Sequence, residues 1–160
     1  MRKLIAMVLP LFLIITGCSF FTTGKDELKW FHTLNEAVEN GAMAEGITMN
    51  DIIGKVEQVG EVLVVYKKDV PDGLAVGVAS ISQRDGTYSW FRESNPVLIK
   101  NIDGQEFSIK TEISTQSSKR FAVYLGIASE QNKTINITIG TVTPIVDKES
   151  QIFYYIEPKQ

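Results

Sequence analysis

The chain contains a single cysteine, Cys18, and this residue has the most distinctive chemical setting in the sequence. A cysteine thiolate is a far stronger nucleophile near neutral pH than a hydroxyl group. Two small residues, Thr16 and Gly17, precede it and would leave the main chain accessible to a peptidase. Because an apolar stretch ends just before them, the pattern indicates a nucleophilic thiol at the end of an apolar segment.

The residues before Cys18 have the layout of a secretory signal. Arg2 and Lys3 carry positive charge, and residues 4–15 are apolar apart from Pro10. A membrane-spanning helix needs about 20 apolar residues, so this segment is too short for one and has the dimensions of an export signal. We therefore expect residues 1–17 to be a signal peptide.

The four residues Ile15-Thr16-Gly17-Cys18 match the lipobox of bacterial lipoproteins at every position. The chain resembles this family in its first eighteen residues, and more loosely resembles the small uncharacterised lipoproteins of spore-forming Gram-positive bacteria. The resemblance implies cleavage between Gly17 and Cys18, transfer of a diacylglyceryl group to the Cys18 thiol, and acylation of the new amino terminus. It also implies a location on the outer, extracytoplasmic face of a cell membrane.

Two alternatives fit the same residues: Cys18 could be an ordinary buried cysteine, or the apolar segment could stay uncleaved as a signal anchor. Cleavage would leave 14 basic and 19 acidic residues, a formal charge of about −5. Such a surface would not adhere electrostatically to anionic lipid. We therefore expect the acyl chains to hold the protein at the membrane, because two or three chains anchor stably.

The rest of the chain divides into a tether and a globular part. Residues 18–29 are mostly polar or flexible and predict a lipidated tether. Residues 30–160 predict a globular, sheet-rich domain, with a candidate subdivision at residues 94–96, where the sequence is Ser-Asn-Pro.

Short helices are predicted at the start of this domain. Thr33 and Glu36 have the spacing of a capping box, and the helix that follows could end or be interrupted at Gly41. A second short helix is predicted to begin at Thr48 and to close at Gly54. Both need a surface to pack on, because isolated short helices are marginal.

From Val56 onward the pattern favours β-strands. Alternating or continuous apolar runs predict strands at residues 61–68, 74–81, 87–92, 107–114, 121–127, 135–139, 142–146 and 152–156. Three Asp-Gly pairs, at 72–73, 85–86 and 103–104, punctuate them, and the pair at 85–86 is typical of a tight hairpin. The expected fold is α+β and mostly β, with antiparallel strands in a sandwich or barrel-like sheet.

Catalytic and metal-binding patterns are weak. His32 is the only histidine and stands between aromatic residues and a predicted helix, which favours a structural or surface role. Residues 117–119 (Ser-Ser-Lys) lie in a polar turn, which argues against a catalytic Ser-Lys dyad. Asp69 and Asp72 flank a proline turn, and calcium binding there would need more oxygen ligands at closer spacing. We predict no catalytic residues, no metal and no cofactor, although paired carboxylates from distant strands could still form a glycosidase site.

Aromatic residues are the more suggestive feature. Trp90 and Phe91 are adjacent in one predicted strand, and Tyr154 and Tyr155 in another. Successive side chains of a strand point to opposite faces, so one member of each pair should face outward on a one-sided sheet. These four residues form a tentative binding surface, unless the predicted helices cover that face and bury them.

The sequence therefore predicts a lipid-anchored, non-enzymatic binding or interaction domain. Its partners would be the membrane, through the anchor, and a protein or cell-wall component. Its mild, mixed charge argues against a nucleic-acid partner. Two alternatives differ in class: a cell-wall-directed hydrolase, which needs two carboxylates converging in a cleft, and a structural component of a membrane complex, which needs a long, uncharged edge strand.

Overall fold

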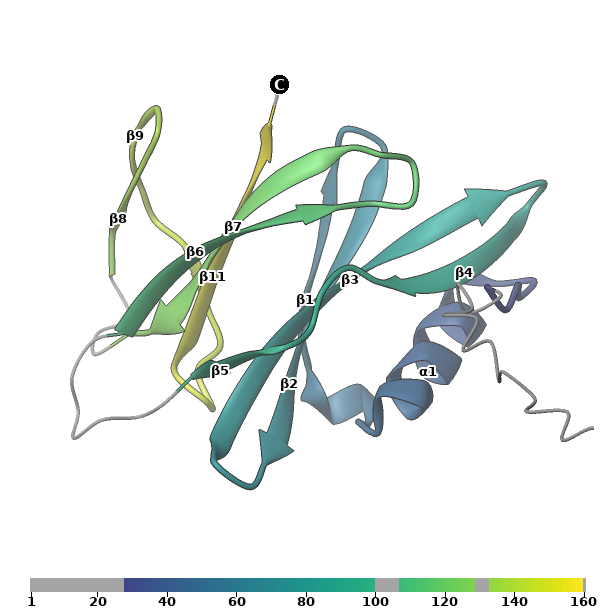
Figure 1. Cartoon of the computed structure of the whole chain (residues 1–160), viewed down its shortest axis with the longest axis horizontal. Coiled ribbons are helices and arrows are strands. Elements are labelled where there is room, and N and C mark those ends of the chain that lie inside the picture. The colour runs from purple at the N-terminus through teal and green to yellow at the C-terminus, as the bar shows by residue number, and fades with distance from the viewer. Residues whose placement is uncertain (1–27, 100–106, 129–132, 160) are drawn as a thin grey trace, which may run out of the picture.

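The computed structural model describes residues 28–99, 107–128 and 133–159. The lipobox at residues 15–18, the signal peptide and most of the tether lie outside the described residues, as does the Asp-Gly pair at 103–104. β-strands dominate the described part of the chain, and all strand pairs are antiparallel (Figure 1). The expected α+β, mostly β, sandwich-like architecture is confirmed.

The first sheet is built from one continuous stretch of chain. Its strands are β1 (Ile52–Gln58), β2 (Glu61–Val70), β3 (Gly73–Arg84), β4 (Thr87–Arg92) and β5 (Val97–Ile99). The order is β1-β2-β3-β4, and β5 also pairs with β3. One end of the long strand β3 pairs with β5 and the other with β4, so both lie along the same side of it.

The second sheet has the order β10-β11-β7-β6. Its strands are β6 (Phe107–Ser114), β7 (Arg120–Ile127), β10 (Ile145–Val146) and β11 (Ile152–Lys159). A small hairpin of β8 (Ile135–Ile137) and β9 (Gly140–Val142) lies beyond this sheet, on the side away from the helix (Figure 1).

The two sheets face each other across the main hydrophobic core. Leu63 and Val78 of the first sheet pack against Phe121, Val123 and Ile156 of the second, and all five side chains are buried. The opposite face of the first sheet packs on the helix α1 (Leu34–Glu45), where Val38 contacts a cluster that includes Val64 and Ile81. The molecule therefore has three main layers: helix, sheet and sheet.

The helix α1 begins as the sequence indicates. Thr33 is its N-cap and forms the capping box with Glu36, whose carboxylate accepts from the Thr33 main-chain amide at 3.2 Å. The helix does not end at Gly41 but continues to Glu45, and Gly46, with φ 71°, closes it. Gly41 is a packing residue, because a Cβ atom there would lie 2.2 Å from Cδ2 of Trp90.

The expected second helix is only a short 3-10 turn, η1 (Met49–Asp51). It starts at Thr48 as predicted, with the Thr48 amide donating to the Asp51 carboxylate at 2.7 Å. Strand β1 then begins at Ile52, four positions before the alternation at Val56 indicates. Gly54 lies inside this strand because the Tyr154 ring packs directly over it, leaving no room for a side chain.

Hairpin turns connect most neighbouring strands of the first sheet. Asp85 and Gly86 have φ 50° and 74°, which confirms the predicted tight turn between β3 and β4. Val59 and Gly60, with φ 45° and 76°, form a similar turn between β1 and β2, which the sequence did not single out. A valine at positive φ is uncommon, since its branched side chain disfavours that conformation.

Two further strand predictions need correction. The strand expected at residues 135–139 ends at Ile137, and Ile139 is exposed at the hairpin tip because β9 begins at Gly140. The strand expected at 142–146 is divided between β9 and β10. Strand β5, which follows residues 94–96, still pairs with β3, and the second sheet starts with β6.

Candidate functional site

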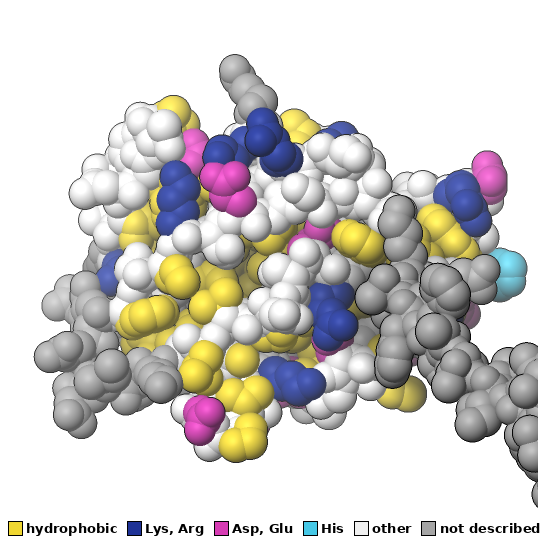
Figure 2. All heavy atoms as spheres, in the orientation of Figure 1, with side chains coloured by type: hydrophobic (Ala, Val, Ile, Leu, Met, Phe, Trp, Pro, Cys, Tyr) yellow, Lys and Arg dark blue, Asp and Glu magenta, His cyan; other side chains and the backbone are white. Residues whose placement is uncertain are grey.

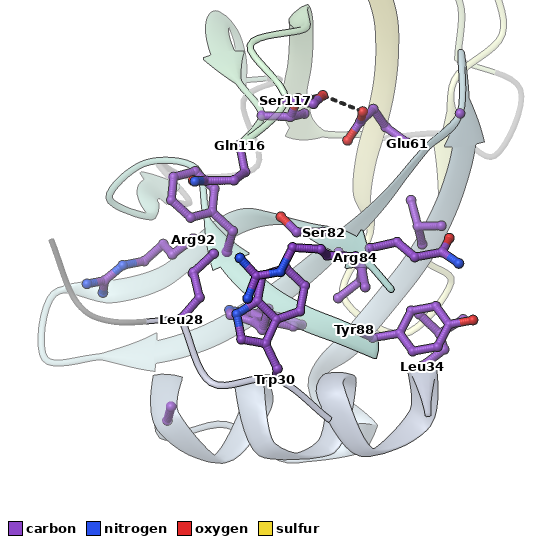
Figure 3. A pocket seen from close by; sticks show the side chains of 18 of the residues that line it. Leu28, Trp30, Leu34, Glu61, Ser82, Arg84, Tyr88, Arg92, Gln116 and Ser117 are labelled. Carbon is purple, nitrogen blue, oxygen red and sulfur yellow. Dashed lines mark hydrogen bonds between the residues drawn. The ribbon is translucent and has the colours of Figure 1, made fainter. Parts of the chain in front are cut away.

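An open groove borders the β3–β4 hairpin, on the face of the first sheet that the second sheet only partly covers. We call it the β4 groove. On this face its lining comes from three segments: the chain before the helix, the β3–β4 hairpin and the β6–β7 loop. Its lining includes Phe91. It also includes Trp30, Glu61, Ser82, Arg84, Gln116 and Ser117 (Figure 3). The groove continues around the edge of β4 toward α1.

The chain before the helix forms one wall of the groove. The main-chain groups of Phe31 pair with those of Tyr88 at 2.8 Å in both directions, which fixes this segment along the free edge of β4. The Arg84 guanidinium carbon lies 4.3 Å from the centre of the Trp30 ring (Figure 3). This cation–π contact holds the indole beside the groove.

The β6–β7 loop forms the opposite wall. The Ser117 hydroxyl donates to Glu61 Oε1 at 2.6 Å (Figure 3). Lys119 Nζ lies 3.0 Å from the same oxygen. Lys119 Nζ also donates to the main-chain oxygen of Val59 at 2.6 Å. Since Glu61 is 7% exposed, these contacts neutralise a nearly buried carboxylate and fasten the loop to the first strand turn.

A polar cluster lies beneath the groove, on the same face. Ser80 is paired with Phe91, and Ser82 with Ser89, so the side chains of these four residues share one face of β3 and β4. Glu93, whose amide donates to the Val78 oxygen, continues this face. We call Ser80, Ser82, Ser89 and Glu93 the serine cluster.

The polar atoms of the serine cluster are buried without partners. Ser80 and Ser89 are each 0% exposed. The three serine hydroxyls and both carboxylate oxygens of Glu93 are covered from solvent, and none forms a hydrogen bond. An unsatisfied buried polar group costs about 1–3 kcal/mol. Five such atoms on one face of β3 and β4 require hydrogen-bond partners that the described side chains do not supply.

The charge of Glu93 is disfavoured in this environment. Burial is the main cause and raises the pKa of Glu93 to about 7. The neighbouring Ser80 lowers the pKa in part, although its contact falls short of a hydrogen bond. The Glu61 carboxylate raises the pKa further, because two like charges lie near each other.

The four aromatic residues of the tentative binding surface do not lie together. Trp90 packs between the sheet and α1, and Tyr154 is 2% exposed in the core between the sheets. Phe91 lines the β4 groove, whereas Tyr155 packs beside Tyr124 on the outer face of the second sheet. The helix packs on Trp90, as the alternative interpretation expected, and of the four residues Trp90 and Phe91 line the groove, on opposite faces of β4.

The other residues considered from sequence lie in structural positions. His32 is exposed just before the helix, and its amide donates to the Glu36 carboxylate. Asp69 and Asp72 flank the exposed turn between β2 and β3. Among the described residues, no group of three or more His, Cys, Asp or Glu side chains could hold a metal ion. Figure 2 shows Lys and Arg side chains interspersed with Asp, Glu and hydrophobic side chains on one face.

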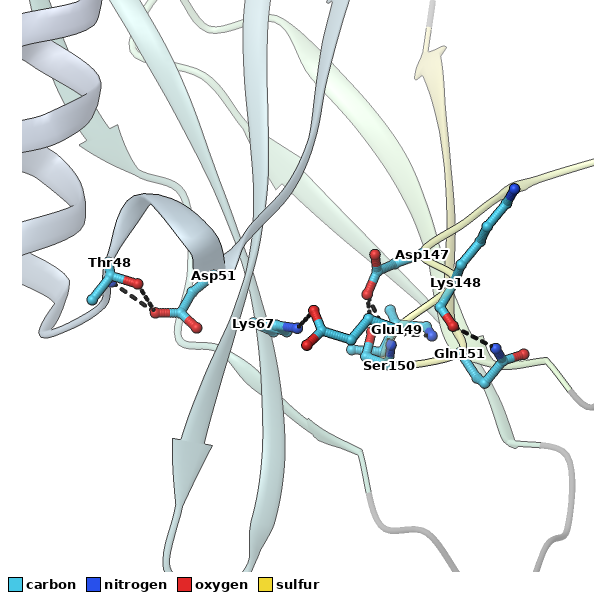
Figure 4. Close-up of polar contacts among 9 residues, drawn as sticks. Thr48, Asp51, Lys67, Asp147, Lys148, Glu149, Ser150 and Gln151 are labelled. Carbon is cyan, nitrogen blue, oxygen red and sulfur yellow. Dashed lines mark hydrogen bonds and ion pairs between the residues drawn. The ribbon is translucent and has the colours of Figure 1, made fainter.

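A second charged cluster joins the two sheets at the other end of the sandwich. Lys67 Nζ lies 3.0 Å from Glu149, with Asp51 and Asp147 nearby (Figure 4). The hydrogen bond to Glu149 raises the pKa of Lys67. Burial raises the pKa of Asp147, but hydrogen bonds from Ser150 and the Lys67 charge outweigh it and leave the pKa lowered. These groups satisfy one another, so we assign them a structural role.

No helix within the described residues is long and apolar enough to cross a membrane. Comparison with family models, with curated proteins and with solved structures finds no match for this chain.

Trp30, Arg84, Glu61 and the serine cluster were not predicted from the sequence as site residues. The sequence contained one indication of the serine cluster. The face of β3 that carries Val76 and Val78 continues with Ser80 and Ser82. A polar continuation of an apolar face indicates a change in what that face contacts. The remaining residues come from separate segments, and only the fold brings them together.

Proposed function

We propose that this chain is a lipid-anchored extracytoplasmic binding protein that receives its ligand in the β4 groove. The observation that carries the proposal is the groove itself, with an aromatic and a cationic wall above a buried, unpaired polar cluster. Ligand sites combine apolar surface with a few convergent polar groups in this way.

The position of the groove along the chain supports the link to the anchor. Leu28, which lines the groove, follows Cys18 by ten residues. An extended chain covers at most about 3.5 Å per residue, so a lipid on Cys18 would keep the groove within roughly 35 Å of the membrane surface. Its ligand would then be a membrane component, a cell-wall component or a protein at the same surface.

A wall hydrolase is the second candidate, because Glu61 and Glu93 lie close enough for one charge to affect the other. A glycosidase pair must reach its substrate from both sides of the bond. Here both Glu93 oxygens are covered, and Glu61 is engaged by Ser117 and Lys119. The geometry therefore favours binding over hydrolysis.

The assembly alternative depends on a free sheet edge. Strand β6 is an edge of the second sheet and carries Lys110 and Glu112 on its exposed face. Charged side chains on an edge strand oppose pairing with another chain. The edge of β6 is therefore a less favourable binding site for a partner strand than the β4 groove is for a ligand.

Two experiments test the proposal. For the anchor, Cys18→Ser should abolish metabolic labelling with a fatty acid and leave unprocessed precursor or a soluble product. Unchanged labelling would overturn lipidation at this residue. For the groove, a photo-crosslinking amino acid at Gln116, which lines the groove, should capture a defined molecule in intact cells.

The matched control for the second experiment carries the same crosslinker at Thr138, an exposed residue of the β8–β9 hairpin. We expect capture at Gln116 only, with loss of capture when Phe91→Ala is added. Equal capture at both positions would count against the groove.

A further inference from the structure

Most charged side chains that line the β4 groove have a partner of opposite charge. Arg92 contacts Glu45 at 3.3 Å, and Glu61 lies 3.0 Å from Lys119 Nζ. Arg84 also lines the groove, and within the described part of the chain no carboxylate pairs with its guanidinium. The groove therefore contains one positive charge that the described residues do not compensate.

The contact with Trp30 holds the Arg84 side chain at the groove. The guanidinium carbon lies 4.3 Å from the centre of the indole ring (Figure 3). A guanidinium that contacts a ring through its face keeps its five N–H donors free, because these donors lie in the plane of the group. Since the side chain is already held, less entropy is lost when an anion binds. Arg84 therefore presents a planar set of donors to a ligand in the groove.

Two further hydrogen-bond donors line the groove. Ser82 and Arg84 are two positions apart on β3, so their side chains leave the same face of the strand, about 7 Å apart along it (Figure 3). The Ser82 hydroxyl has no hydrogen-bond partner among the described residues. Gln116 lines the groove from the β6–β7 loop, and its amide can donate as well. A group rich in acceptors is the natural partner for this set.

An oxyanion meets these requirements. A carboxylate or phosphate group is negatively charged, and a guanidinium binds such a group through two parallel hydrogen bonds. A neutral sugar would leave the charge of Arg84 uncompensated, and a cationic ligand would add to it. We propose that the β4 groove binds its ligand through an oxyanion held by Arg84 and Ser82, with an apolar part of the ligand against Phe91.

The inference deepens the proposed function and depends on it for the view that the groove admits a ligand. The order of residues along the sheet supports it. Arg84 is paired with Thr87 beside the hairpin turn, Ser82 follows two positions along β3, and Phe91 is paired with Ser80 two positions further on the same face. The groove is therefore cationic near the turn and aromatic farther along the strands, which suits a ligand with a charged head and an apolar body.

The test is a titration of the full chain in a nonionic detergent at neutral pH. Sodium hexanoate is the probe, hexanamide is the matched molecule without charge, and the thermal midpoint Tm is measured. We expect a saturable rise in Tm with hexanoate only, since a ligand that binds the folded state stabilises it. Tryptophan emission should change over the same concentrations, because Arg84 lies against Trp30. An equal rise in Tm with both molecules, or none with either, would overturn the proposal.

Variants make the test specific to the site. Arg84→Gln should weaken hexanoate binding at least tenfold, and Ser82→Ala should weaken it severalfold. Arg84→Lys should fall between the parent and Arg84→Gln, because an ammonium keeps the charge but loses the planar pair of donors. Lys55→Gln, at an exposed position of β1 outside the groove lining, removes the same charge and should bind like the parent. Retained binding in both Arg84→Gln and Ser82→Ala would contradict the assignment, and the second variant covers a failure of the first to fold.

The oxyanion could belong to a lipid headgroup or to a soluble acid. If the headgroup is the source, nanodiscs that contain phosphatidylglycerol should raise Tm above nanodiscs of phosphatidylcholine alone in the parent but not in Arg84→Gln. Equal Tm values in the two nanodiscs would identify a soluble acid. Capture at Gln116 in cells without hexanoate binding would overturn this inference alone. Hexanoate binding without capture would overturn the proposed cellular ligand alone.

Discussion

The Ser117 hydroxyl donates to Glu61 Oε1 at 2.6 Å and thereby joins the β6–β7 loop of one sheet to the first residue of β2 in the other. Thr115 holds Ser117 in place, because the Thr115 hydroxyl lies 3.0 Å from that of Ser117 and accepts from the Lys119 main-chain amide at 3.2 Å. The loop therefore has a defined position over the groove, and the width of the groove depends on a short chain of side-chain hydrogen bonds.

We expect Ser117→Ala to release this loop. The Glu61 carboxylate would lose a charge-assisted hydrogen bond, and bonds to charged groups contribute about 1.5–3 kcal/mol. Lys119 would still compensate part of the Glu61 charge. We therefore expect a loss of about 1–2 kcal/mol in the free energy of unfolding, measured in urea. Faster amide exchange at residues 115–119 should accompany it. Ser118→Ala, at an exposed neighbour without such a bond, is the control.

Glu93 should make stability depend on pH. Its pKa is about 7 in the folded chain, against an ordinary value of 4.5. As pH rises through this window the unfolded chain loses its proton first, so the free energy of unfolding should fall between pH 4.5 and 7 and then level off. Each pKa unit corresponds to about 1.4 kcal/mol. Because Glu93 as a whole residue is only half-buried, although its carboxylate oxygens are covered, we expect a total of about 2 kcal/mol.

The variant Glu93→Gln should remove this dependence and be more stable than the parent at pH 8. Urea unfolding of both chains at pH 5 and pH 8, with Glu57→Gln as control, measures the difference. Parallel pH profiles for the parent and Glu93→Gln would show that this carboxyl does not titrate as described.

Gly41→Ala should destabilise the fold although alanine favours helices. The added Cβ would lie 2.2–2.5 Å from three Trp90 atoms at the rigid base of the ring, so the helix or the indole must move. Overpacking typically costs about 1–3 kcal/mol, more than the gain of about 1 kcal/mol in helix propensity. Thermal unfolding should show a lower Tm, whereas Glu39→Ala on the exposed face should change it little.

Lys67→Met should weaken the contact between the sheets at neutral pH. Without the ammonium, the Asp51, Asp147 and Glu149 carboxylates lose their shared cation, and we expect a loss of about 1 kcal/mol. The pKa values of Asp51 and Asp147 are lowered in the folded parent, so the stability that they add is present above about pH 4 and is lost as pH falls. The parent and variant should therefore converge in acid. A difference that persists at pH 3 would indicate lost packing instead.

Much of the fold was predictable from local pattern. The alternation over residues 107–114 and 121–127 gave the correct strands, and Asp85-Gly86 gave the correct turn, because period and turn chemistry are local properties. The errors have tertiary causes. Gly41 and Gly54 suggested helix ends, but each is a glycine because an aromatic side chain from another element lies on it.

The candidate site was less predictable. Trp90 and Phe91 were identified as candidate contact residues and both line the groove, but Tyr154 belongs to the core and Tyr155 to the outer face of the second sheet. Glu61 and Glu93 are 32 positions apart in the chain and converge only because β2, β3 and β4 are adjacent. Spacing in the sequence contains no information on such a pair.

The division of the strands between the sheets also sets an order of assembly. Residues 52–99 supply every strand of the first sheet, and the second sheet and the small hairpin come from residues 107–159. Most strand pairs join sequence neighbours, so their loops close at low entropic cost. A chain that emerges amino terminus first could complete α1 and the first sheet before the rest follows. Only the inner face of that sheet, with Leu63, Val78 and the serine cluster, would then stay exposed until the second sheet forms.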